Sequence, residues 1–129
     1  MKKNVRKSIK EDELMEKVIE NKSFEFAVRI VKMAMELKKG QHYELGSQVL
    51  KSGTSIGANV AEAQNAQSRR DFVSKLHIAY KEANETEYWL RLLERTEIIE
   101  TIIAKSLIGD VKEIQRILTA IIKTTNTNI

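Results

Sequence analysis

Apolar side chains recur along most of the chain at the three- and four-residue spacing of an α-helix. At about 100° per residue, this periodicity predicts four helices, over residues 23–39, 44–64, 69–95 and 101–124. The breaks between them are short, and short connections make consecutive helices run antiparallel. The pattern therefore predicts an all-α fold, an antiparallel up-down-up-down four-helix bundle.

Two of the breaks carry signals that end or begin a helix. Gly40 stands where the C-terminal cap of the first helix is expected, and Lys38 and Lys39 suit the negative end of the helix dipole. Ser68 can cap the third helix, with Asp71 three residues later as a short capping box. The third break, "RTEIIET", has weak signals, so the boundary between the last two helices is the least defined.

Length and composition favour one domain with a short segment at each end. In the chain of 129 residues, residues 1–22 are expected to form a basic polar leader, partly helical or flexible. Residues 23–125 form the predicted bundle, and 126–129 a C-terminal tail. The absence of proline favours long uninterrupted helices, and the absence of cysteine excludes disulfides and thiolate metal sites. No secretory signal and no run of about 18 apolar residues occurs, so we expect a cytoplasmic protein without membrane contact.

The predicted second helix is poor in charge and rich in small residues, above all in "SGTSIGANVAEA" at positions 52–63. Gly53, Gly57 and Ala61 align at four-residue intervals beside its apolar edge, which is typical of a ridge that another helix backbone approaches closely. Each interior glycine costs about 1 kcal/mol relative to alanine, and close packing is the simplest compensation. The ridge is therefore predicted to contact another helix.

The first and third helices carry more apolar surface than one protomer needs. Charged residues of the first helix fall within an arc of roughly 80°, whereas a bundle helix needs an apolar stripe of only about 100° or somewhat more. In the third helix a second apolar stripe lies beside the main seam. We infer self-association; the alternative is that the same residues fill only the protomer's own core. The predicted oligomer interface consists of Gly53, Gly57, Ala61, Ile78, Trp89 and Leu92.

Residue types that carry catalysis or bind metals do not form a site in this sequence. A di-metal bundle needs Glu-x-x-His pairs, but neither His42 nor His77 has a glutamate three residues before it. No phosphate-binding loop occurs, because the glycines of the second helix have no strand before them. Three carboxylates, Glu82, Glu85 and Glu87, project in different directions from one helix. We therefore expect no enzyme, no cofactor and no metal.

One charge pattern points to a ligand. Four cations of the last helix, with no acid among them, fall within about 40° of each other opposite its apolar face. At 1.5 Å per residue the stripe is about 27 Å long, enough to follow several phosphates of a nucleic-acid backbone. The alternative is the solvated face of an amphipathic helix. The stripe consists of Lys105, Lys112, Arg116 and Lys123; Arg69 and Arg70 are weaker candidates, and the leader adds Lys2, Lys3, Arg6, Lys7 and Lys10.

The block "SGTSIGANVAEAQNAQSRRDFVSKLHIAYKEANETEYWLRLLERT" resembles the four-helix-bundle family named after proteins encoded in intervening sequences of bacterial 23S ribosomal RNA genes, also called S23 ribosomal proteins. The similarity extends from about Phe24, through "SFEFAVRIVKM", to "IIKTT". The resemblance implies an antiparallel bundle that assembles as a homopentamer and has no established catalytic residues. A related branch resembles the accessory variability proteins of diversity-generating retroelements, basic pentameric barrels that bind nucleic acid and a reverse transcriptase.

Together these observations predict a non-catalytic oligomeric bundle, a pentamer by resemblance, that binds structured RNA or DNA through basic surface. The alternative is a protein-interaction adaptor, for example a partner of a reverse transcriptase, that does not contact nucleic acid. Such an adaptor would use exposed apolar helical surface, and its interaction would depend on Trp89 or Leu92 and survive nuclease treatment.

Overall fold

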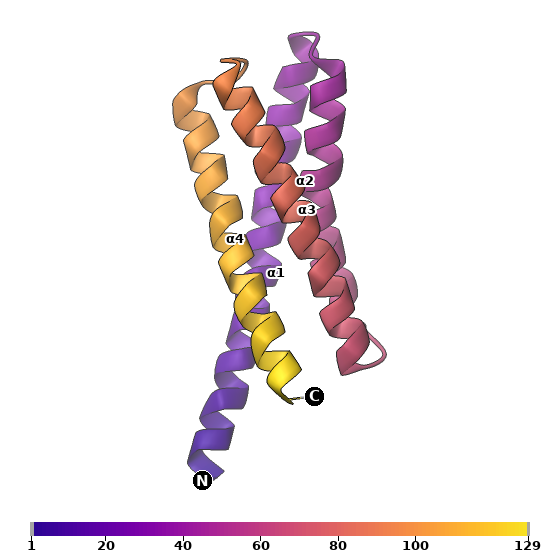
Figure 1. The fold of residues 1–129 in the computed structure, drawn as a ribbon, viewed down its shortest axis with the longest axis vertical. Helices are drawn as coiled ribbons and strands as arrows, with labels where there is room; N and C mark the ends of the chain where they lie inside the picture. Colours follow the sequence, from indigo (N-terminus) through magenta and orange to yellow (C-terminus); the bar gives the residue numbers. More distant parts are fainter. Residues whose placement is uncertain (1, 129) are drawn as a thin grey trace.

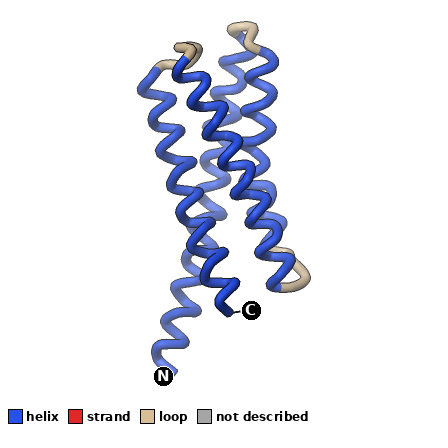
Figure 2. The backbone as a smooth tube through the Cα atoms, viewed as in Figure 1, coloured by secondary structure: helices blue, strands red, loops and turns tan. Residues whose placement is uncertain are grey.

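Four long helices joined by short turns make up the computed structural model, which describes the backbone of residues 2–128 and the side chains of residues 10–127. The helices are α1 (Lys2–Lys39), α2 (Tyr43–Ala63), α3 (Arg69–Arg95) and α4 (Thr101–Asn128) (Figure 1). Figure 2 shows that the described part of the chain is helix and loop without strands. Each helix packs against the next, and α4 closes the bundle on α1. The predicted all-α up-down-up-down bundle is confirmed.

The first and last helices are longer than predicted. α1 begins at Lys2 and not near residue 23, because no glycine or proline interrupts the leader and its apolar spacing continues into the bundle. Ile19 is buried, and Met15 packs against the core. α4 continues to Asn128 through most of the expected tail. Four leader cations have side chains outside the described residues: Lys2, Lys3, Arg6 and Lys7.

None of these helices, within the residues described, contains a stretch that is both long enough and apolar enough to cross a membrane.

The turns after α1 and α3 place non-glycine residues in the left-handed conformation. Gln41 has a φ of 68° and Glu97 a φ of 60°. After α1, the backbone N–H of His42 donates to the carbonyl of Leu37 at 2.8 Å, which closes the helix end. Gln41, and not the expected Gly40, is therefore the residue that reverses the chain.

The start of α3 follows its sequence signal. The Ser68 side chain accepts a hydrogen bond from the backbone N–H of Asp71 at 3.1 Å, as the predicted cap requires. The Asp71 carboxylate accepts from the backbone N–H of Gln67, one residue before the cap. Both bonds satisfy backbone N–H donors in the connection between α2 and α3.

The small-residue ridge of α2 packs against α1 of the same chain. A Cβ at Gly53 would lie 2.8 Å from Cγ2 of Ile30, and a Cβ at Gly57 would lie 3.2 Å from the carbonyl oxygen of Ser23. The predicted close contact is therefore present. Its partner is α1 of the same chain, whereas Gly53 and Gly57 were predicted to contact a neighbouring subunit. Gly53 and Gly57 belong to the protomer's own packing, and Ala61 is the exposed member of the ridge.

On its other side α2 joins α3 through two buried hydroxyl groups. Ser52 and Thr86 are hydrogen-bonded, with their side-chain oxygens 2.9 Å apart, and neither residue is exposed to solvent. The Thr86 hydroxyl also lies 2.7 Å from the carbonyl oxygen of Glu82, one turn earlier in α3. This polar pair fixes the register of two helices that otherwise meet through apolar side chains.

α1 and α4 are the most loosely packed neighbours, and ion pairs bridge them near the surface. Nζ of Lys22 lies 2.9 Å from Oε1 of Glu113. Arg29 pairs with Asp110 and donates to the Ser106 hydroxyl at 3.0 Å. These contacts hold two carboxylates of α4 on its α1 side, away from the predicted basic stripe.

Candidate nucleic-acid interface

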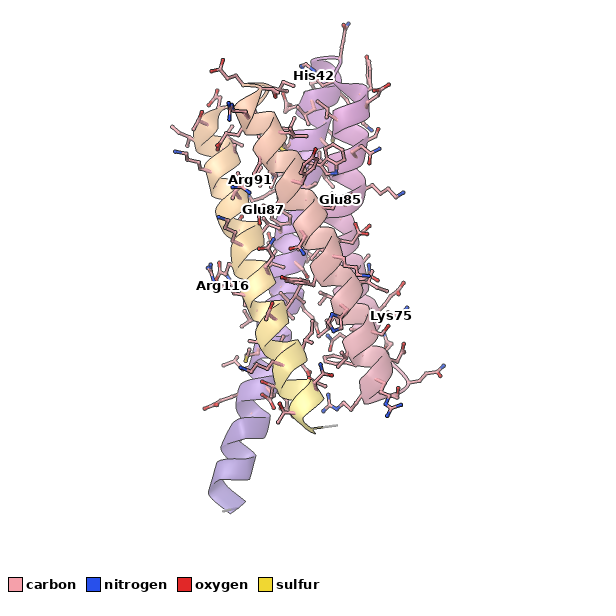
Figure 3. The ribbon with its side chains drawn as sticks, viewed as in Figure 1. His42, Lys75, Glu85, Glu87, Arg91 and Arg116 are labelled. Carbon is pink, nitrogen blue, oxygen red and sulfur yellow. The ribbon has the colours of Figure 1, made fainter. Side chains whose placement is uncertain are left out.

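The four cations predicted on the last helix lie on the solvent side of α4. Lys105, Lys112, Arg116 and Lys123 are all exposed, whereas the apolar positions between them, such as Leu118, are buried. Figure 3 shows Arg116 at the outer edge of α4, pointing away from the bundle. At 1.5 Å per residue the row extends about 27 Å.

α3 adds basic side chains to the same side of the bundle. Gln115 of α4 donates from Nε2 to Oε1 of Glu87 on α3 at 2.9 Å, which fixes how the two helices face each other. Counting about 100° per residue from Glu87, five exposed basic residues fall on one solvent-facing arc of α3 that begins next to α4. We define the basic face as these five residues and the four of α4: Arg70, His77, Lys81, Arg91, Arg95, Lys105, Lys112, Arg116 and Lys123.

Glu87 is a carboxylate between the two rows of cations, and its charge is already engaged. Nη1 of Arg91 lies 3.6 Å from Oε2 of Glu87, and the Glu87 side chain is only 18% exposed. Figure 3 shows both residues on the side of α3 that faces α4. Because the carboxylates of Asp110 and Glu113 are held toward α1, the basic face presents positive charge to solvent over both helices.

Of the two weaker candidates, only Arg70 belongs to the basic face. Arg69 turns toward α1, where its Nη1 lies 3.9 Å from Oε1 of Glu16, and its guanidinium sits 5.7 Å from the centre of the Phe72 ring. Burial raises the pKa of Glu16, and Arg69 opposes that rise. The Arg69 guanidinium is therefore engaged by Glu16 and the Phe72 ring and does not point toward the basic face.

Apart from Arg70, the basic residues of α3 were not predicted from the sequence, although a signal for them existed. Positions 70, 77, 81, 91 and 95 follow helical spacing on one side of the third helix. Glutamates stand between them in the sequence and conceal the pattern until the helix is placed against α4. The basic face is consequently wider than the predicted single stripe.

The three carboxylates singled out in the sequence, Glu82, Glu85 and Glu87, lie in different surroundings on α3. Glu85 accepts a hydrogen bond from Nε1 of Trp89 at 3.4 Å, and Glu87 faces α4. Burial, reinforced by the nearby charge of Glu85, raises the pKa of Glu82, while Lys51 lowers it. Among the described residues no group of three or more histidines and carboxylates is placed to hold a metal ion. These carboxylates form no shared acid–base centre.

The remaining predicted interface residues lie on α3 at different depths. Ile78 is 40% exposed, whereas Trp89 and Leu92 are half-buried. The Trp89 ring meets that of Tyr88 edge-on, with centroids 5.3 Å apart. Larger exposed apolar side chains occur on α1, where Phe24 is 66% exposed.

The sequence of this four-helix bundle matches the model of a known protein family. Residues 15–120 match the family model described as 23S rRNA-intervening sequence protein. The chain belongs to this family. No curated protein sequence matches this 23S rRNA-intervening sequence protein.

A crystal structure from Bacteroides thetaiotaomicron resembles this member of the family over nearly the whole bundle. It is described as a protein with unknown function from the S23 ribosomal protein family. The two proteins are 53% identical, the match covers 84% of this chain and 98% of the other, and the TM-score is 0.82. The similarity supports the four-helix-bundle fold of the present chain.

Proposed function

We propose that this protein binds structured RNA or DNA without catalysis and without reading base sequence, through the basic face. The observation that carries the proposal is the exposure of basic side chains on two adjacent helices, while Glu87 between them is paired with Arg91 and Glu94 on the same side of α3 is half-buried. The formal net charge is only +4, so the concentration of charge on one side matters more than the total.

Phosphate contacts are the physical basis of this binding. Each lysine or arginine that neutralises a phosphate releases condensed counterions, which gives affinity without base recognition. The row on α4 is about 27 Å long, and phosphates of one DNA strand lie about 3.4 Å apart along the helix axis, so the row can follow several of them. The family description refers to a 23S rRNA intervening sequence, which makes ribosomal RNA the first ligand to test.

The test measures how a fluorescent 23S rRNA hairpin binds at increasing salt. We expect the logarithm of the association constant to fall linearly with the logarithm of salt concentration. Replacing Lys105, Lys112, Arg116 and Lys123 by alanine should weaken binding at low salt by about tenfold or more and reduce that slope. A matched control removes the same charge from exposed positions outside the basic face, with alanine at Lys17, Lys32, Lys38 and Lys51.

The control variant should bind almost as tightly as the parent. Equal binding by the parent and the variant of the α4 cations would contradict the proposal. Retention of a protein partner by that variant after nuclease treatment would then favour the adaptor function, with the partner docked on apolar surface.

We further propose that the protein self-associates, as a homopentamer, through an apolar face outside the basic face. Phe24, Val31 and Met35 follow one stripe of α1 and are 66%, 38% and 59% exposed. Tyr43, at the start of α2, is 59% exposed, and Ala61 is exposed beside the glycine contact. We define the apolar face as these five residues. Apolar surface of this extent on a bundle favours contact with another copy. In such an assembly the basic face is repeated in every subunit.

A further inference from the structure

A groove lies between α3 and α4 at the end of the basic face. Its volume is about 580 Å³, within the range of sites that hold small molecules. Tyr80 is half-buried against the core, and Ile122 is buried, so one wall is aromatic and apolar. The polar lining comes from His77 of α3 and from Thr119, Lys123 and Asn126 of α4.

The charge of this groove distinguishes it from three other hollows of the described surface. Its ionisable lining residues are the basic His77 and Lys123, together with the Tyr80 phenol, and no carboxylate lines it. Three other hollows each include carboxylates, among them Glu16, Glu36 and Glu113. Those hollows have mixed charge, since cations such as Arg69, Arg29 and Lys22 also line them, whereas the groove between α3 and α4 offers an anionic ligand no opposing carboxylate.

We propose that this groove binds an unpaired nucleotide of the nucleic acid held on the basic face, an inference that rests on the proposed function. The Tyr80 ring offers a surface on which a base can stack, and stacking accepts any base. The Asn126 amide and the Thr119 hydroxyl can bond to base or sugar edges. Lys123 and His77 are placed for the phosphate that belongs to the same nucleotide.

The position of Lys123 connects the groove to the rest of the basic face. Lys123 is both the last cation of the α4 row and a lining residue of the groove. A backbone that follows Lys112 and Arg116 therefore arrives at the groove. The preferred ligand is a paired segment that continues into a single-stranded one, with the first unpaired base stacked on Tyr80.

The experiment compares a blunt 20-base-pair DNA duplex with the same duplex carrying a ten-thymidine 3′ overhang. The parent protein should prefer the tailed duplex, and Tyr80→Leu should reduce this preference by about tenfold while leaving blunt-duplex affinity unchanged. Tyr80→Phe keeps the ring and should retain the preference. Because the tail also adds phosphates, the decisive quantity is the ratio of tailed to blunt affinity in each variant.

The outcomes separate the inference from the proposed function. Failure of the parent to bind the 23S rRNA hairpin and either duplex would overturn both. Binding of the hairpin but of neither duplex would overturn the groove alone. Binding of both duplexes with the same ratio in the parent and in Tyr80→Leu would overturn the groove alone.

A second measurement does not depend on how well the Tyr80 variants fold. The parent protein is irradiated with a tailed duplex that contains 5-iodouracil at the first unpaired position, and the cross-linked peptide is identified by mass spectrometry. Cross-links at Tyr80 or His77 are expected. Cross-links confined to residues outside the groove would overturn the inference.

Discussion

A single missing methyl group allows α1 and α2 to meet as closely as they do. A Cβ at Gly53 would overlap the Ile30 side chain. The overlap involves Ile30 atoms close to the Ile30 backbone, which have little freedom to move away. At Gly109, on the exposed side of α4, a Cβ would meet nothing within 4 Å. Gly53 and Gly109 therefore form a matched pair, in which the cost of overpacking can be compared with the gain in helix propensity.

Alanine at these two positions should change stability in opposite directions. Gly53→Ala gains about 1 kcal/mol of helix propensity but incurs about 1–3 kcal/mol of overpacking against Ile30, so we expect a net loss. Gly109→Ala should raise the free energy of unfolding by up to about 1 kcal/mol. Urea unfolding at one protein concentration measures both. A more stable Gly53→Ala variant would contradict the close contact between the helices.

The raised pKa of Glu82 predicts how one carboxyl changes stability with pH. Burial is the largest cause of the shift, so in the folded state the Glu82 carboxyl keeps its proton at pH values somewhat above the ordinary pKa of 4.5. Since the folded state binds more protons in that window, its contribution to stability falls as pH rises through the raised pKa. Glu82→Gln should therefore stabilise the protein at pH 7 and give little gain at pH 4. Unfolding curves at both pH values check this, with exposed Glu25→Gln as the control.

At the scale of helices, the hydroxyl pair of Ser52 and Thr86 predicts a measurable coupling between α2 and α3. Removing one partner leaves the other hydroxyl in a buried contact with less hydrogen bonding, at a cost of about 1–3 kcal/mol. Ser52→Ala and Thr86→Val should each destabilise the protein, while the double variant should lose less than their sum. A double-mutant cycle in urea measures this coupling. Strict additivity would mean that the buried contact contributes nothing.

Helix positions were predictable wherever apolar spacing and end signals agreed. The expected ranges 44–64 and 69–95 match α2 and α3 within one residue, and Ser68 caps α3 as its sequence indicates. The leader was predicted to be partly helical or flexible, and it forms the first part of α1 because nothing in it breaks a helix. The turn after α1 could not be assigned from residue type, since Gln41 adopts the left-handed conformation that glycine usually takes.

Contacts between helices were less predictable than the helices themselves. The glycine ridge was recognised, but a ridge does not identify the helix that packs on it, and α1 proved to be the partner of Gly53 and Gly57. The α4 cations were found because no acid lies among them. The other basic residues of α3, apart from Arg70, needed the register set by Gln115 and Glu87, which a single sequence does not contain.

At the scale of the whole molecule, the apolar face predicts assembly. Light scattering should give a mass above that of the 14.8-kDa chain, because another copy would cover the apolar surface on α1 and α2, and near five times that mass for the proposed homopentamer. Phe24→Ser combined with Met35→Ser should lower that mass. The matched control carries Leu14→Ser and Ile102→Ser, two residues that are 62% and 82% exposed elsewhere on the bundle. A monomeric parent at micromolar concentration would contradict the proposed self-association.

The order in which the helices pack also has a kinetic consequence. Three of the four helix pairings join neighbours in the sequence, and the one that joins the chain ends, α1 with α4, is the sparsest. Such a topology needs little long-range search, and domains rich in local contacts fold in microseconds to milliseconds. A hairpin of α2 and α3 can therefore form before α1 and α4 meet, while the ribosome is still synthesising the chain.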